Sequence, residues 1–388
     1  MVRIGSANPA WSDARQLAAG CVPALPRTAA TLDLAVGHVL GEDLIAKSDL
    51  PPAHTAMMDG YAVCGEPPWP VIGQVHAGQA AVSIEPGQAL RVSTGAHIPP
   101  ASTRGVPQEH AVVEDGIVVG MVAQSERTNI RTPADEARLG DLVISAGARV
   151  TPVVAGIAAS CGYDTIQVFA RPIVDVIVTG DELADSGPSR PGTIRDSLTM
   201  QVPSWIAWSG GQCGRVTRIH DSLGELVRAL QSARGHIVIV TGGSAHGPRD
   251  FGRGALVELG AELVVDEVDC KPGHPTVLAG LPDGRIIANI PGNPLAAAVS
   301  YMTVVDPVIT TMSGAALRPL RAAVLHEPMT TRTTRILPVT VEHGVATPTE
   351  YQRPAMLRGL AHADALAVVA PADETFECHL LPVPWQVD

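Results

Sequence analysis

The segment from about residue 172 to 313 repeats one pattern, in which an apolar run is followed by a loop containing glycine and then by a helical segment. The clearest apolar runs are 173–178, 213–219, 237–240 and 286–290. Strands that alternate with helices are typical of parallel sheets, and strands without polar alternation fit burial on both faces. We therefore predict an α/β fold with a doubly wound parallel sheet in this part of the chain.

The rest of the chain shows different patterns of apolar residues, glycine and proline. Apolar residues at helical spacing predict helix in the first 45 residues. From about 46 to 135, short apolar runs alternate with glycine and proline, which indicates a small β-rich domain. Further strand-like runs surround a short helix between 142 and 168. Short strands return from about 317 to 388, where we predict a small β-barrel.

The charge balance excludes several classes of function. The chain has 27 basic and 39 acidic residues and a net charge of −12, with no basic cluster. Such a surface repels phosphate backbones and anionic lipid, so we expect neither a nucleic-acid nor a membrane partner. The N-terminus has no apolar signal region and no run of 18 apolar residues occurs, which predicts a soluble, cytoplasmic protein.

Three loops follow the predicted parallel strands at 179–182 (TGDE), 241–244 (TGGS) and 290–294 (IPGNP). Parallel strands place their carboxyl ends at one edge of the sheet, where ligands bind. Glycine allows close approach of the backbone to a ligand, and helix N-termini attract anions. The loops therefore predict a site for a phosphorylated ligand, although ordinary turns in which glycine supplies a positive φ remain the alternative.

Charged side chains accompany these loops. Asp181, Glu182 and Asp250 would repel a phosphate unless a divalent cation lay between them. Lys271 is one of only two lysines, with Lys47, and could supply a point charge to the same anion. Asp196 or Ser197 is predicted to cap the helix that follows the first loop.

Several motifs resemble those of one family and occur in the same order along nearly the whole chain. They are MDGYAV (58–63), VSTGAHIP (92–99), NIR (129–131), LVISAGARVTP (142–152), TGDEL (179–183), KPGHP (271–275) and IPGNP (290–294). In these motifs the sequence resembles the molybdopterin molybdenumtransferases, which complete molybdenum cofactor synthesis and are related to the E domain of gephyrin.

The resemblance implies a reaction and an architecture. Members insert molybdenum from molybdate into adenylylated molybdopterin with release of AMP, assisted by a divalent cation such as Mg²⁺. The implied domains are an elongated N-terminal domain (1–45 with 136–170), an inserted β-rich domain (46–135), a molybdopterin-binding α/β domain (171–316) and a C-terminal β-barrel (317–388). The implied assembly is a homodimer whose cleft is shared between subunits, with a molybdopterin adenylyltransferase or an apo-molybdoenzyme as a further partner.

The resemblance also implies roles for particular residues. Asp59, Glu182, Asp250 and Lys271 take catalytic positions, and the first three would hold the metal. The implied substrate-binding residues are Thr94, Asp181, Asp196, Ser197, Gly242, Gly243, Pro272, Gly273, Pro291, Gly292, Asn293 and Pro294.

The sequence also departs from the family pattern at the expected site. His236 replaces an aspartate, His274 replaces the second lysine of KPGKP, and Arg353-Pro354 replaces Gly-Ser. Two alternatives therefore remain: a catalytically weak or inactive paralogue that binds molybdopterin or acts as a scaffold, and a different phosphotransfer or nucleotide-hydrolysing enzyme. A side chain of Arg104 or His236 in the cation position would favour the binding-only alternative.

Overall fold

The computed structural model describes residues 7–80, 82–122, 128–244, 247 and 251–385. The chain forms two compact units, a larger one that includes residues 7–28, 37–39 and 168–385 and a smaller one that includes 29–36 and 40–167. The finer four-domain boundaries stay a prediction.

A six-stranded sheet organises the larger unit. Its strand order is β16 (Gln212–Ile219), β13 (Ile173–Thr179), β17 (Ile237–Thr241), β21 (Ile286–Ile290), β20 (Val277–Gly280) and β18 (Glu262–Asp266). The first four strands are parallel, whereas β20 and β18 run antiparallel to their neighbours. The four predicted strands are therefore parallel, as expected, whereas the sequence analysis did not predict β20, which runs opposite to the other five strands, or the edge strand β18. The cause of the reversal is the tight turn between β20 and β21, closed by a bond from the Leu281 amide to the Arg285 carbonyl, because so short a connection joins only antiparallel strands.

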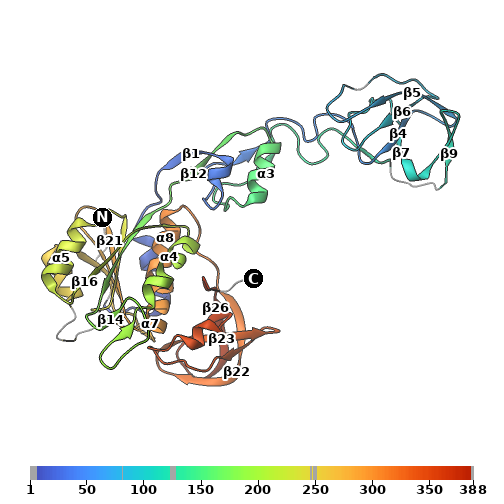
Figure 1. Ribbon diagram of the computed structural model, residues 1–388. Helices are drawn as coiled ribbons and strands as arrows, with labels where there is room; N and C mark the ends of the chain where they lie inside the picture. The colour runs from blue at the N-terminus through green and yellow to red at the C-terminus, as the bar shows by residue number, and fades with distance from the viewer. Residues whose placement is uncertain (1–6, 81, 123–127, 245–246, 248–250, 386–388) are drawn as a thin grey trace. The chain divides into compact units, whose positions relative to one another are not determined.

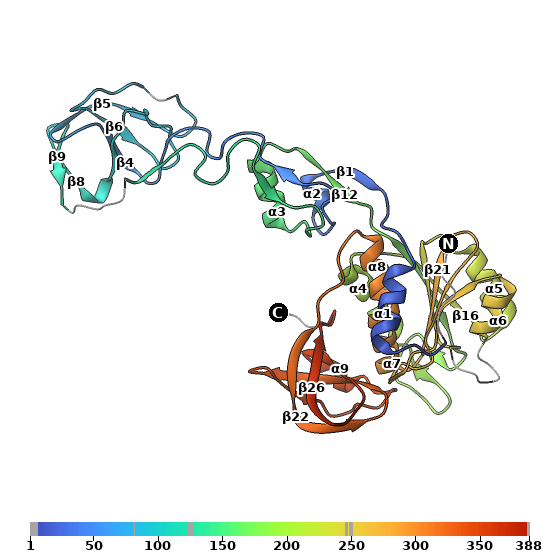
Figure 2. The same cartoon turned by 180° about the vertical axis from the view of Figure 1, so that it is seen from behind.

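Helices cover both faces of this sheet, as predicted (Figures 1 and 2). On one face lie α5 (Leu223–Ser232) and α6 (Gly252–Glu258), and neighbours on the other face are α1 (Trp11–Gly20), α4 (Leu198–Ser209), α7 (Pro294–Ser300) and α8 (Asp306–Met312). The side chains of consecutive strand residues point to opposite faces of the sheet, so that Val176 packs in the core with α4 and Ile177 packs in the core with α5. This two-sided burial explains why the strands lack polar alternation.

The helical run that follows β21 is part of the core. It consists of α7, a π-helical turn η2 (Tyr301–Val305) and α8. Within the described residues, Pro294–Met312 is long and apolar enough to cross a membrane, but 94% of its apolar window is buried inside the protein. Such burial is the behaviour of a core helix.

A closed β-barrel completes the larger unit and confirms the predicted C-terminal barrel. Its strands are β22 (Arg321–Thr331), β23 (Thr334–Glu342), β24 (Val345–Pro348), β25 (Ala365–Val369) and β26 (Ala372–Leu381), with the short helix α9 (Arg358–Ala361) before β25. Closure follows because β23 pairs with both β24 and β25. The short strand β19 (Cys270–Lys271) pairs with β23 and thereby joins the α/β domain to the barrel.

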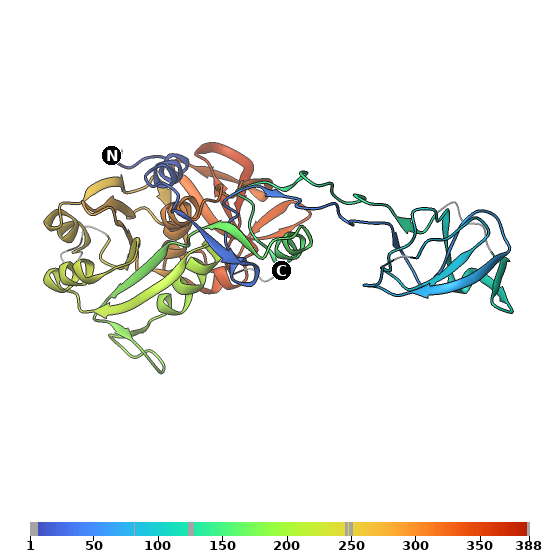
Figure 3. The same cartoon turned by 90° about the horizontal axis from the view of Figure 1, so that it is seen from above.

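The smaller unit is rich in strands, as the sequence predicts (Figure 3). Its main sheet has the order β7 (Arg104–Pro107), β4 (Gly60–Val63), β6 (Ala89–Val92), β5 (Trp69–Val75), β9 (Ile117–Met121) and β8 (Ala111–Glu114), with a 3₁₀ turn η1 (Gln108–His110). Shorter elements are β2 (Leu44–Ile45), β3 (Thr55–Ala56), β10 (Ile130–Arg131), β11 (Leu142–Ile144) and α3 (Pro152–Ser160).

The first 45 residues differ from their prediction. After α1 they form β1 (Arg27–Thr31), which pairs with β12 (Thr165–Phe169), and only one further helical turn, α2 (Leu32–Ala35). The apolar spacing therefore marks only the single turn α2, and the helix predicted around it does not continue, because the neighbouring segment Arg27–Thr31 pairs with a distant strand.

A buried ion pair anchors the helical layer beside the barrel. The Asp306 carboxylate accepts hydrogen bonds from Arg318 Nη1 and Ser209 Oγ, each at 2.8 Å, and its side chain is only 2% exposed. The Arg318 guanidinium stacks on Trp208 at 3.6 Å. Tyr301, whose hydroxyl lies 2.9 Å from Ser209 Oγ, extends the network into η2.

Substitution of Asp306→Asn should lower the free energy of unfolding by about 3–5 kcal/mol, because it leaves the Arg318 charge without its buried partner. Urea unfolding followed by tryptophan fluorescence measures the loss. The matched control is Asp283→Asn, which breaks an ion pair with Arg285 at a 53% exposed carboxylate and should cost less than about 1 kcal/mol. Equal losses in the two variants would contradict the role assigned to the buried pair.

Candidate functional site

The carboxyl ends of the parallel strands surround a cavity of about 620 Å³. We call it the acidic cavity, because three carboxylates line it and Arg195 is the one lysine or arginine among its described lining residues. Its acids are Glu182, Asp196 and Asp221, and its glycines are Gly180, Gly242, Gly243 and Gly292. The three predicted loops therefore meet in one place. A cavity of this size can hold a small-molecule ligand.

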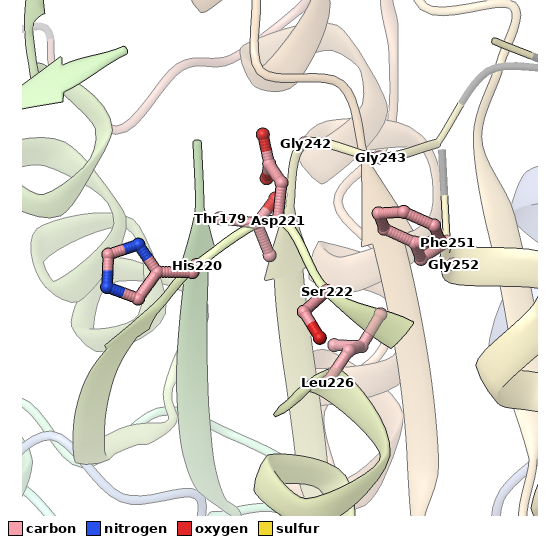
Figure 4. Close-up of a pocket in the computed structure, with 9 residues that line it drawn as sticks. All are labelled: Thr179, His220, Asp221, Ser222, Leu226, Gly242, Gly243, Phe251 and Gly252. Atoms are coloured by element: carbon pink, nitrogen blue, oxygen red, sulfur yellow. The ribbon is translucent and has the colours of Figure 1, made fainter. Parts of the chain in front are cut away.

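Backbone and side-chain hydrogen bonds fix the loop of the second motif, whose Gly242 and Gly243 are labelled in Figure 4. The Gly242 amide donates to the Ile290 carbonyl at 2.9 Å, and Asn289 Nδ2 donates to the Gly243 carbonyl at 3.2 Å. The start of α6 packs tightly against this arrangement, since a Cβ on Gly252 would lie 1.7 Å from Asn289 Nδ2. Only glycine fits at that position without displacing the amide that holds the loop.

Asp196 and Ser197 precede the helix that follows the first motif. Asp196 Oδ1 accepts hydrogen bonds from the amides of Leu198 at 3.0 Å and Thr199 at 3.1 Å, so this carboxylate caps α4. Ser197, the other predicted capping residue, precedes the helix without a side-chain capping bond. Asp196 and Ser197 both line the acidic cavity.

Asp181 lies next to Glu182 but is held by a different segment. Its Oδ1 lies 3.0 Å from His220 Nδ1, and the side chain of His220 is 82% exposed. This hydrogen bond, with the nearby charge of Glu225, raises the pKa of His220 above its ordinary value. The imidazole points away from Asp221 and the Gly242–Gly243 turn (Figure 4). His220 does not line the acidic cavity; with Asp221, Gly242 and Gly243 it lines the smaller adjoining pocket that Figure 4 draws.

Sequence reasoning missed two lining residues. Asp221 directly precedes Ser222, which caps α5, and Asp221 itself lines the acidic cavity. The sequence could have indicated this position, because Asp221 follows β16, a fourth parallel strand that ends at the same edge of the sheet. Arg195 carries no comparable signal, since it lies in the short strand β15 (Ile194–Arg195), which pairs with β14 (Leu183–Ala184).

A second cavity, of about 700 Å³, lies between the α/β domain and the barrel. We call it the cationic pocket, because Lys271, His274, Arg335 and Arg353 line it. Lys271 and Arg335 are register partners in the pairing of β19 with β23. Asn293 lines both this pocket and the acidic cavity, so the IPGNP loop separates the two.

The cationic pocket holds part of the predicted set of site residues. Lys271, Pro272, Gly273 and Pro291 were expected beside the TGDE and TGGS loops, but they line the second pocket. In the IPGNP loop, Gly292 and Pro294 line the acidic cavity, where the sequence analysis expected them. The physical reason is the pairing with β23, which places the KPGHP segment against a barrel strand far away in sequence.

Asp59 and Thr94 form a separate cluster in the smaller unit. Asp59 Oδ1 accepts hydrogen bonds from the Thr94 amide at 2.7 Å and from Thr94 Oγ1 at 2.9 Å. The hydrogen bond from the Thr94 backbone amide is the main reason that the pKa of Asp59 lies below its ordinary value. Gly60 must remain glycine, because a Cβ there would lie 2.0 Å from the Val106 carbonyl oxygen.

The described residues do not test the predicted metal triad. Asp59 belongs to the smaller unit, Glu182 to the larger one, and Asp250 lies outside the described residues. In the part of the chain that the structure describes, no three histidine, cysteine, aspartate or glutamate side chains gather as a metal site. The triad stays a prediction.

One departure from the family pattern lies away from the acidic cavity. His236 precedes β17, at the amino ends of the strands, and its Nδ1 accepts a hydrogen bond from the Ile173 amide at 3.0 Å. His236 lines neither cavity, so it does not support the binding-only alternative. Arg104 lies in β7 of the smaller unit, where it is the register partner of Val63.

Substitution of Asp181→Asn should lower the pKa of His220 toward that of an ordinary exposed histidine, because the imidazolium loses its charged hydrogen-bond acceptor. An NMR titration of the imidazole protons measures this shift. Asp185→Asn is the matched control, since Asp185 pairs with Arg218 rather than with His220. A His220 pKa that is the same in wild type and Asp181→Asn would refute the assignment.

Comparisons with known proteins give the family. Three family models match consecutive parts of the chain: MoeA N-terminal region (domain I and II) at residues 10–162, probable molybdopterin binding domain at 175–311, and MoeA C-terminal region (domain IV) at 322–377. Molybdopterin molybdenumtransferase 2 of Mycobacterium tuberculosis is 31% identical over 365 residues, covering 86% of this chain and 89% of that protein. The molybdopterin molybdenumtransferase of Bacillus subtilis is 32% identical over 298 residues, covering 72% and 69%.

Solved structures show the same fold. The crystal structure of the molybdopterin biosynthesis protein MoeA from Pyrococcus horikoshii superposes with a TM-score of 0.76 at 22% identity, covering 98% of this chain and 100% of that chain. The fold therefore extends over the described units, each with its counterpart in a MoeA protein. The chain belongs to the molybdopterin molybdenumtransferase family and is an enzyme of molybdenum cofactor biosynthesis.

Proposed function

We propose that this enzyme inserts molybdenum from molybdate into adenylylated molybdopterin and releases AMP. The observation that carries the proposal is the pair of adjoining cavities of opposite charge, which share Asn293 in their walls. A reaction between a nucleotide phosphoanhydride and a metal oxyanion needs two such environments, one compatible with a bridging cation and one that attracts an anion.

The acidic cavity suits the adenylylated pterin. The Gly242 amide is bonded to Ile290, but the amides of Gly243, Gly292 and Asn293 belong to loops that line the cavity and are suited to phosphate oxygens. Leu183 and Ile194 supply an apolar wall. Glu182 and Asp221 provide the hard oxygen ligands that Mg²⁺ takes together with substrate phosphates and water, so the donor set fits this ion. When bound, Mg²⁺ would neutralise charge on the phosphoanhydride.

The cationic pocket suits molybdate. Lys271 supplies a compact point charge, and the guanidinium groups of Arg335 and Arg353 present planar donors to an oxyanion. The side chain of Asn293, at the junction, is placed to contact groups in either cavity. Molybdate or water held at this junction would be the oxygen nucleophile that cleaves the phosphoanhydride and releases AMP.

The proposed reaction predicts AMP release that requires molybdate and Mg²⁺, measured by chromatography with adenylylated molybdopterin as substrate. Glu182→Gln should lower kcat about 100-fold, because it removes a charge that supports the cation at the reacting anhydride. Glu262→Gln is the matched control: this exposed residue of β18 lines neither cavity and its substitution should leave kcat unchanged.

The alternatives give different outcomes in the same assay. Molybdopterin binding by the wild type without AMP release would overturn the proposed reaction and favour an inactive, binding paralogue. Cleavage of a different nucleotide would favour another phosphotransfer enzyme on this scaffold.

We further propose a homodimer in which Asp59 and Thr94 of one subunit complete the site of the other. Support comes from the exposed position of this hydrogen-bonded pair and from the family resemblance. Asp59→Asn and Glu182→Gln should each keep only about a hundredth of wild-type activity alone. Their mixture should recover about a quarter of it, because half of the dimers would be mixed and hold one intact site of two. Sedimentation establishes the dimer, and a mixture as inactive as its components would rule out a shared site.

A further inference from the structure

Arg253, in the first turn of α6, bridges two segments that belong to different cavities. Its Nη1 donates a hydrogen bond to the Ser244 carbonyl at 3.4 Å, and its Nη2 donates to Asp266 Oδ1 at 2.6 Å. Nη2 also lies 3.5 Å from Glu267 Oε1. The side chain is only 24% exposed, and Arg253 lines neither the acidic cavity nor the cationic pocket. Its effect on the position of a bound ligand therefore passes through the segments that it joins.

The segment on one side of Arg253 is the end of the TGGS loop. The Gly243 carbonyl accepts hydrogen bonds from Asn289 Nδ2 and from the Gly252 amide, each at 3.2 Å. Ser244 is buried and presents the next carbonyl to Arg253. Two successive peptide groups of the loop are thus held by β21 and α6. Because Gly243 lines the acidic cavity, a shift of Ser244 would move part of the cavity wall.

The segment on the other side consists of residues 266–268, and we call it the anchoring segment. Its backbone is bonded to the KPGHP motif and the residue that follows it, since the Val268 amide donates to the His274 carbonyl at 3.0 Å and the Glu267 amide to the Thr276 carbonyl at 2.9 Å. Glu267 has a φ of +65°, which is uncommon for a residue with a side chain and persists only where the surroundings fix it. The anchoring segment therefore fixes the KPGHP wall of the cationic pocket.

We propose that Arg253 is a positioning residue that fixes the TGGS wall of the acidic cavity relative to the KPGHP wall of the cationic pocket. This inference rests on the proposed function, because it requires the ligands of the two cavities to react with each other. Such a reaction depends more steeply on the alignment of the two ligands than the binding of either ligand does. Loss of the bridge should therefore lower kcat and leave the KM of each substrate unchanged.

Arg253→Lys separates this role from a contribution to folding. Lysine keeps a cation beside Asp266 and Glu267, but its single nitrogen replaces the guanidinium fork and cannot also reach Ser244. We expect kcat for AMP release to fall about tenfold, with the KM for adenylylated molybdopterin and for molybdate within about twofold of wild type. The midpoint of urea unfolding should match that of wild type, because the ion pair is kept.

The matched control is Arg285→Lys. Arg285 also joins a carboxylate to a backbone carbonyl, since it bonds to Asp283 and donates from Nη1 to the Leu230 carbonyl at 2.7 Å. It lies in the turn before β21, at the opposite edge of the sheet, and lines neither cavity. Loss of this bridge should leave kcat at the wild-type value.

Asp266→Ala tests the same bridge from its other end and decides the matter if Arg253→Lys folds poorly. It should also lower kcat, and the double variant should be no slower than Arg253→Lys alone, because that change has already broken the bridge. A wild-type kcat in both single variants, losses that multiply in the double variant, a rise in the KM of one substrate alone, or a fall in kcat matched by a lower urea midpoint would each overturn the role of Arg253 and leave the proposed function intact. Absence of AMP release by the wild type would overturn the proposed function as well.

Discussion

The short backbone pairing between β19 and β23 is the contact on which the arrangement of the site depends. It holds only Cys270–Lys271 against Thr334–Arg335, yet it fixes the barrel beside the carboxyl edge of the sheet. The amide of Leu295 reinforces this contact by donating to the Pro354 carbonyl at 3.0 Å. Two positive side chains from distant segments thereby line the same pocket, next to a cavity lined by acids.

Separation of charge between the two cavities has a physical advantage. Carboxylates close to an oxyanion would repel it, and lysine or arginine beside Mg²⁺ would weaken the binding of that ion. The IPGNP loop lies between the two groups of charges, and its Asn293 is neutral, so it can contact either ligand without favouring one sign. Such an arrangement would let two ligands of different chemistry approach each other while each keeps its own electrostatic environment.

Much of this site could be predicted from residue pattern. The convergence of the TGDE, TGGS and IPGNP loops followed from parallel strand order, and the structure places Glu182, Gly242 and Asn293 around one cavity. The departures at His236 and His274 looked equivalent in sequence, but one lies at the opposite edge of the sheet and the other lines the cationic pocket. The position of a residue along the chain does not show whether its side chain reaches a cavity.

The sequence by itself determined the strands, the two covered faces of the sheet and the edge at which glycines and acids gather, because these depend on local periodicity and on the direction of parallel strands. Only the tertiary structure decided that Lys271 lies beside Arg335 rather than in the acidic cavity, and that one strand of the sheet, β20, runs opposite to the others. A two-residue pairing between segments some sixty residues apart leaves no periodic signal. Its position is selected by packing of the whole barrel against the helical layer.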